Sequence, residues 1–160
     1  MTEKQLETAY LIQANAACEL TALGTSPYSL RQGQWREAPY FKLDGEGAQG
    51  GTFIGSALRA LKRLGLSADV DIRQIPEIKK TAEDDPKFCD MLRRVAGLNY
   101  VATEGLSHDR KNPDMEAALM IGAAELAQRL DPGFHVSGDA AMLYSQASER
   151  LSTQIGGPNP

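Results

Sequence analysis

The stretch from residue 113 to 130 constrains the fold of this chain more than any other. Its middle reads AALMIGAAELA, in which Glu125 is the only charged residue. Asn112-Pro113 precedes the stretch and Asp131-Pro132-Gly133 follows it, and both are typical helix boundaries. A helix that is apolar on nearly all sides has to be covered by other helices. We therefore predict a central core helix, whose small residues let a neighbouring helix approach closely: Ala118, Gly122, Ala123 and Ala124.

The N-terminal part of the chain contains two further helical segments. Thr2 and Gln5 fit a capping box, in which each side chain satisfies a backbone N–H of the other, at the start of a helix over 2–23. A second helix is predicted over 52–64, because apolar residues line one side of it and Gly65 supplies a stop.

The C-terminal part adds two more helices around the core segment. Asp85-Pro86 is a strong start signal for a helix that runs to 96 and on toward 103. Ser137 is the predicted cap of the last helix, which extends to about residue 155. The sequence thus predicts a mainly α fold, a single-domain bundle of about five helices over residues 1–155, with a flexible tail at 156–160.

Two segments between the helices favour a short two-stranded β ribbon. Residues 68–73 alternate polar and apolar side chains, as a half-buried strand does. Residues 40–43 form an apolar run that follows Pro39, which suits an edge strand only. We expect these two segments to pair, beside a turn opened by Pro76.

Charge and composition exclude several classes of protein. The chain has 160 residues, a formal net charge of −4 and no dense Lys/Arg block, so we expect no nucleic-acid partner. No run of apolar residues is long enough to cross a membrane, and the N-terminus does not resemble a signal peptide. We therefore expect a cytoplasmic protein, in which Cys18 and Cys89 are buried reduced thiols.

The residues from 45 to 50, GEGAQG, match the spacing G-x-G-x-x-G. This segment resembles the fingerprint of dinucleotide-binding folds, in which the glycines admit a pyrophosphate beside a helix N-terminus. The context argues against such a site: Asp44 and Glu46 oppose an anion, Lys42 interrupts the preceding strand, and no further βα units follow. A flexible loop is the simpler interpretation. The alternative function is a small-molecule or nucleotide/phosphate-binding domain, or a minor enzyme, that uses the glycine-rich loop 45–52. Its ligand would be bound by Gly45, Gly47, Gly50, Gly51, Thr52 and Arg59.

No catalytic motif is present in the sequence. The histidines, His108 and His135, lack a recognised metal-ligand spacing, and the adjacent Ser107-His108-Asp109 cannot converge as a catalytic triad. The acidic run 83–85 is interpreted as a solvated capping run, because a proline follows it. We predict no catalytic residues, metal or cofactor, and favour a protein without catalysis of its own.

Residues 24–51 form a long segment without helical period that is rich in aromatic residues, glycine and proline. Long loops in compact domains are usually functional or disordered, and aromatic side chains argue against disorder. Since tyrosine and tryptophan dominate interface hot spots, we predict binding of another protein, in an adaptor, regulatory or inhibitor role. The predicted contact residues are Tyr28, Trp35, Arg36, Tyr40 and Phe41. A homodimer through the helix 113–130 is a further prediction.

Overall fold

The computed structural model describes residues 2–20, 53–66, 72–104 and 113–155 of the chain. Within these ranges every regular element is helical, which confirms the predicted mainly α fold. The described residues form six α-helices and one 3-10 turn: α1 (Glu3–Leu20), α3 (Phe53–Arg63), η2 (Ile72–Gln74), α4 (Ile75–Asp84), α5 (Pro86–Glu104), α6 (Pro113–Leu130) and α7 (Gly138–Ile155). The bundle has one helix more than expected, because the turn predicted at Pro76 is part of the ten-residue helix α4.

The predicted β ribbon is not supported. Ile72 and Arg73 belong to the 3-10 turn η2, which leads directly into α4, and residues 40–43 and 68–71 lie outside the described residues. Single 3-10 turns are frequent at the N-termini of α-helices. The prediction failed because an alternation this short does not separate a strand from a turn that precedes a helix.

Two of the predicted helix-start signals act as expected. The Thr2 N–H donates to Oε1 of Gln5 at 2.9 Å and the Gln5 N–H donates to Oγ1 of Thr2 at 3.0 Å, so the capping box is confirmed. At the start of α5, Oδ1 of Asp85 accepts the N–H groups of Lys87 (3.1 Å) and Phe88 (3.2 Å). These bonds explain why the helices begin where the sequence predicts.

Gly65 ends α3 in the way that its position suggested. Its φ of 75° lies in the left-handed region, which a residue with a Cβ atom adopts at a cost. The N–H of Gly65 donates to the carbonyl of Lys62, and the N–H of Leu66 donates to the carbonyl of Leu61. This pair of bonds is the Schellman motif, and the buried Leu61 and Leu66 accompany it.

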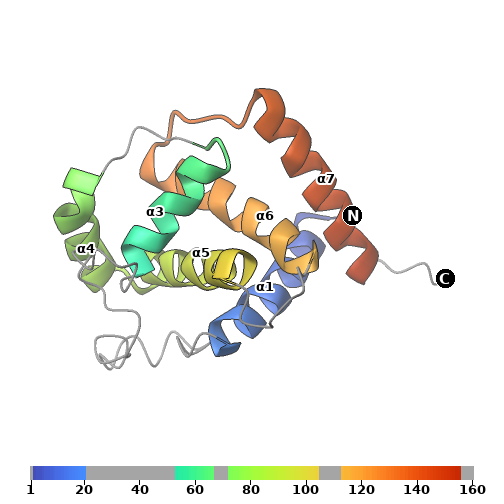
Figure 1. Cartoon of the computed structure of the whole chain (residues 1–160), viewed down its shortest axis with the longest axis horizontal. Coiled ribbons are helices and arrows are strands. Elements are labelled where there is room, and N and C mark those ends of the chain that lie inside the picture. The colour runs from blue at the N-terminus through green and yellow to red at the C-terminus, as the bar shows by residue number, and fades with distance from the viewer. Residues whose placement is uncertain (1, 21–52, 67–71, 105–112, 156–160) are drawn as a thin grey trace.

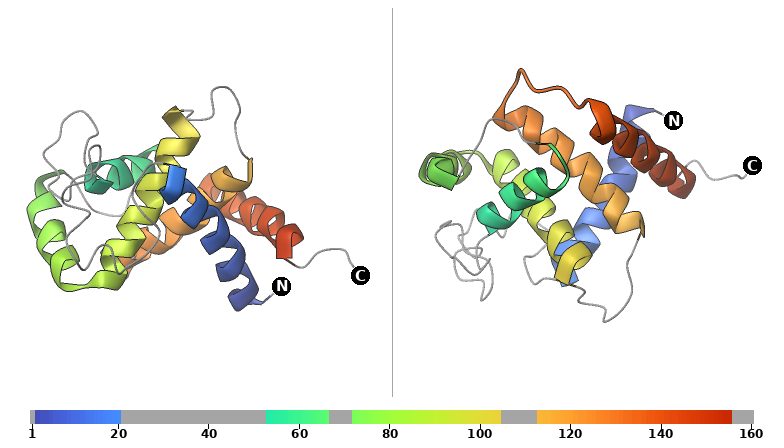
Figure 2. Two further views of the ribbon diagram at one scale, coloured as in Figure 1. Left: turned by 90° about the horizontal axis from the view of Figure 1, so that it is seen from below. Right: turned by 45° about the horizontal axis from the view of Figure 1, so that its top comes forward.

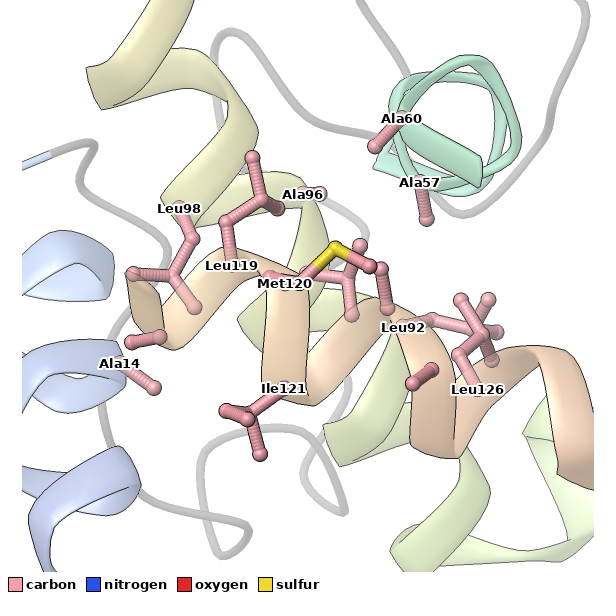
Figure 3. Packing of buried hydrophobic residues seen from close by; sticks show 14 of the residues in the cluster. Ala14, Ala57, Ala60, Leu92, Ala96, Leu98, Leu119, Met120, Ile121 and Leu126 are labelled. Atoms are coloured by element: carbon pink, nitrogen blue, oxygen red, sulfur yellow. The ribbon is translucent and has the colours of Figure 1, made fainter. Parts of the chain in front are cut away.

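Helix α6 forms the centre of the bundle, as predicted. It packs against α1, α3, α5 and α7, and Figure 1 shows it crossing the middle of the molecule. Eleven of its residues are buried. Figure 3 shows Leu119, Met120, Ile121 and Leu126 of α6 among side chains of the neighbouring helices. Because apolar residues lie on most sides of α6, they are removed from water only when several helices pack around it.

Glycine allows two helices to come close to α1. A Cβ atom on Gly122 of α6 would stand 2.7 Å from the ring of Tyr10, and one on Gly97 of α5 would stand 3.2 Å from Sγ of Cys18. The small residues of α6 thus face helices of the same chain. The homodimer predicted through 113–130 stays a prediction, and it would have to use the outer positions of α6, such as the exposed Glu125 and Gln128.

The two peripheral helices lie at opposite ends of the molecule. Helix α4 flanks α3 and α5 at one end, and α7 lies along α1 and α6 at the other (Figure 2). Within the described ranges, no helix combines the length and the apolar character that a membrane span requires.

Candidate functional site

Most of the residues predicted to bind a partner or a ligand lie outside the described residues. These are Tyr28, Trp35, Arg36, Tyr40, Phe41, Gly45, Gly47, Gly50, Gly51 and Thr52. Arg59 is described, and it is an exposed residue on the outer side of α3. His135 is exposed in the connection between α6 and α7, whereas His108 lies outside the described residues. The candidate sites below therefore come from the helices.

Helix α3 presents a cationic face. Its inner side is buried through Ile54, Ala57 and Leu61, and its outer side carries Arg59, Lys62 and Arg63, all three exposed. Residues three and four apart are neighbours on a helix surface, so the three cations form one group. In the part of the chain that the structure describes, no carboxylate forms an ion pair with them.

A buried amide fixes the position of Arg63 within this group. Nη2 of Arg63 donates to Oδ1 of Asn99 on α5 at 2.9 Å. Asn99 is 8% exposed, and its Nδ2 donates to both Oγ (3.3 Å) and the backbone carbonyl (3.4 Å) of Ser56. A chain of hydrogen bonds thus runs from the interface of α3 and α5 to a surface guanidinium. Because the side-chain amide of Asn99 is neutral, this hydrogen bond does not neutralise the positive charge of Arg63.

Helix α7 presents an apolar pair to solvent. Its inner side is buried through Ala140, Ala147 and Leu151, whereas Met142 is 62% and Leu143 46% exposed. Ile12 of α1 is a further exposed large apolar residue, at 53%. Met142 and Leu143 are consecutive residues of α7. Exposed apolar patches are typical of contact surfaces, and methionine adapts readily to different partners.

A cluster of charged side chains on α5 is buried or partly buried in the bundle. Nη2 of Arg93 donates to Oδ1 of Asp90 at 3.1 Å, and Nη2 of Arg94 lies 3.8 Å from Oδ2 of the same carboxylate. Arg93 is fully buried and Asp90 is 4% exposed. Because this carboxylate is buried and paired with two guanidinium groups, it has little surface that a substrate could reach, so we interpret the cluster as structural. The sequence does not reveal this cluster, because charged residues on a helix normally lie on the surface.

Both cysteines are buried in the helical bundle. Cys18 and Cys89 are not joined to each other by a disulfide, as expected for reduced thiols. Burial, together with the nearby charge of Asp90, raises the pKa of Cys89 to about 12. The thiolate is the reactive form, so this side chain is inert at neutral pH. Cys18 donates its S–H to the backbone carbonyl of Arg93 at 3.8 Å.

An acidic pair lies where α1 meets α6. The carboxyl group of Glu125 is partly buried, although the residue as a whole is exposed, and this burial raises its pKa. The nearby charge of Glu7 raises the pKa of Glu125 further, and Arg94 lowers it. Two carboxylates alone do not hold a metal ion. Among the described residues, no group of three or more His, Cys, Asp or Glu side chains is placed to bind one.

Comparisons with known proteins do not assign this chain to a family. No family model, no curated protein and no solved structure matches this chain.

Proposed function

We propose that this chain is a cytoplasmic helical protein that acts by binding another protein and catalyses no reaction of its own. The observation that carries the proposal is the apolar pair on α7, Met142 and Leu143. Covering the exposed parts of these two side chains would contribute roughly 2 kcal/mol of apolar burial. The aromatic residues predicted to contact a partner, Trp35 among them, support the same function from the sequence.

The position of the apolar pair supports binding over a structural role. Within the described residues α7 packs mainly against α1 and α6, and it lies at the edge of the bundle (Figure 1). The inner residues of α7 are already buried in the core. In addition, Nε of Arg150 on α7 lies 2.8 Å from Oδ1 of Asp114 on α6, and this ion pair joins the two helices. The fold therefore does not need Met142 and Leu143 on the outer side of the helix.

Site-specific photo-crosslinking in the source cells tests the proposal. A photoreactive phenylalanine analogue is placed at Ser145, an exposed residue one turn after Met142, and at Glu83 on α4 as the matched exposed control. We expect a discrete adduct from position 145 and none from position 83. The double variant Met142→Gln and Leu143→Gln should reduce the adduct several-fold. Equal adducts from both positions, or none from 145, would contradict binding through α7.

Three further measurements test the other candidates. An adduct with twice the mass of the chain would identify a homodimer in place of a different partner. A thermal-shift series with nucleotides, sugar phosphates and divalent metals tests the alternative ligand site that includes Arg59, because a ligand bound to the native state raises the melting temperature. Trp35→Ala tests the predicted aromatic contact: unchanged folding together with unchanged adduct yield would remove Trp35 from the binding surface.

A further inference from the structure

The cations of α3 are concentrated on a chain that is otherwise acidic. Helix α3 carries three cations and no acid, and the whole chain has a net charge of −4, so the other residues together carry −7. Lys62 and Arg63 lie in the last turn, where the helix dipole favours cations. Arg59 lies one turn earlier and has no such benefit, and like charges at three- and four-residue spacing repel one another. The helix would be more stable with at least one acid on this face.

The hydrogen bonds of Arg63 give this face a defined geometry. Long cationic side chains on a surface lose conformational entropy when they bind, and this loss weakens exposed ion pairs. Arg63 is already held by the 2.9 Å bond to Asn99, whose own amide is held by Ser56. Its remaining N–H groups have no partner among the described residues, so they are available to a planar acceptor such as a carboxylate.

We propose that Arg59, Lys62 and Arg63 form a docking surface for a short acidic segment of a partner protein. This inference rests on the proposed protein-binding function and adds a second surface to it, since α3 and α7 lie on different sides of α6 (Figure 1). The three side chains have the spacing at which a partner helix presents glutamates or aspartates three and four residues apart.

The charge distribution favours a short acidic segment over other anions. A nucleic acid or an anionic membrane extends far beyond one helix, and it would meet the net negative charge of the remaining chain. A small anion such as phosphate binds best where several donors converge in a concave site. The three cations instead stand beside one another on the outer side of a helix, which suits several carboxylates spread along a peptide.

The experiment is an NMR titration of the full chain with defined peptides. The probe is an alanine-based helical peptide with glutamates at i, i+3 and i+4, and the matched control has glutamines at the same positions. We expect the glutamate peptide to shift the Nε–H signal of Arg63 and the side-chain amide signal of Asn99, saturably and less strongly at higher salt. Each of the variants Arg59→Gln, Lys62→Gln and Arg63→Gln should weaken binding about two- to five-fold, as exposed ion pairs do. Lys80→Gln, an exposed cation on α4, should leave it unchanged.

Three results would overturn the docking surface. The glutamine peptide could produce the same shifts, inorganic phosphate could saturate these signals and displace the glutamate peptide, or the same signals could shift with protein concentration alone. The last result would indicate a second copy of the chain as the occupant. The crosslinking at Ser145 requires no cation on α3, and the titration requires no natural partner. Failure of the acidic docking surface is therefore distinguishable from failure of the proposed function.

Discussion

Gly122 of α6 lies against the ring of Tyr10 of α1, so closely that a Cβ atom on Gly122 would stand 2.7 Å from Cε1 and from the hydroxyl oxygen of the tyrosine. Tyr10 is 3% exposed and therefore has little room to move. The contact fixes the distance between the central helix and the N-terminal helix. Its energetic consequences can be measured directly.

Gly122→Ala is expected to lower the free energy of unfolding by about 1–2 kcal/mol. Overpacking costs roughly 1–3 kcal/mol, and the better helix propensity of alanine offsets part of this cost. Urea unfolding at neutral pH measures the difference. Gly133→Ala is the matched control, because its new Cβ would meet only Oδ1 of Asp131 at an ordinary 3.6 Å.

The double variant Tyr10→Leu with Gly122→Ala tests whether the ring causes that loss. We expect it to lose less stability than the sum of the two single variants, because the smaller side chain makes room for the new methyl group. Strict additivity would show that the strain of Gly122→Ala arises elsewhere.

Asp85→Ala should lower the free energy of unfolding by about 1 kcal/mol at pH 7, the usual contribution of a helix cap. The N–H of Phe88 lowers the pKa of Asp85 most, and Arg129, whose Nη2 is 3.3 Å from Oδ2, and the N–H of Lys87 add to the shift. A lowered carboxyl pKa contributes stability that is present above the ordinary value of 3.8 and lost as the pH falls through the folded pKa.

Urea unfolding between pH 7 and pH 2 measures this dependence. The difference in unfolding free energy between the wild type and Asp85→Ala should be largest at pH 7 and should decrease as the pH falls below the ordinary aspartate pKa. Asp85→Asn keeps a capping oxygen, so its loss at pH 7 should be smaller. Asp84→Ala, at the neighbouring exposed acid, is the control and should change little. A difference that is constant with pH would refute the role of the charge.

Asp90→Asn should destabilise the fold by about 3 kcal/mol, because it leaves the buried guanidinium of Arg93 beside a neutral amide. Arg94→Gln is expected to cost much less. Its guanidinium is 3.8 Å from the carboxylate, and its side chain is 21% exposed. Thermal unfolding of both variants shows which of the two substitutions costs more stability. Equal losses would mean that Arg93 does not depend on this carboxylate.

Glu125→Gln should stabilise the protein at pH 7. The pKa of Glu125 is raised by burial and by Glu7, so the ionised form is disfavoured in the folded state. The cost is present above the folded pKa and vanishes as the pH falls below the ordinary glutamate value. The advantage of Glu125→Gln in unfolding free energy should therefore disappear in acid. Glu149→Gln on the exposed side of α7 is the control, and an equal gain there would contradict a local cause.

The local signals of the sequence determined the helices. The capping box at Thr2 and the proline starts at Asp85-Pro86 and Asn112-Pro113 predicted where α1, α5 and α6 begin, because capping bonds join residues only a few positions apart. The apolar run around Ile121 likewise identified the central helix, since its burial follows from its composition. The alternation near Ile72 misled, because a pattern of so few residues is compatible with a turn.

The tertiary structure alone decided which residues meet. The contact of Tyr10 with Gly122 and the bond of Arg63 to Asn99 join residues far apart in the chain, and no local pattern encodes such pairs. Arg93 is likewise polar by type and buried by position. Helix formation depends on bonds within a few residues, whereas burial and electrostatic partnership depend on how whole helices pack. The sequence therefore determined the helices and the core helix among them, and their packing decided the cationic face of α3 and the apolar pair of α7.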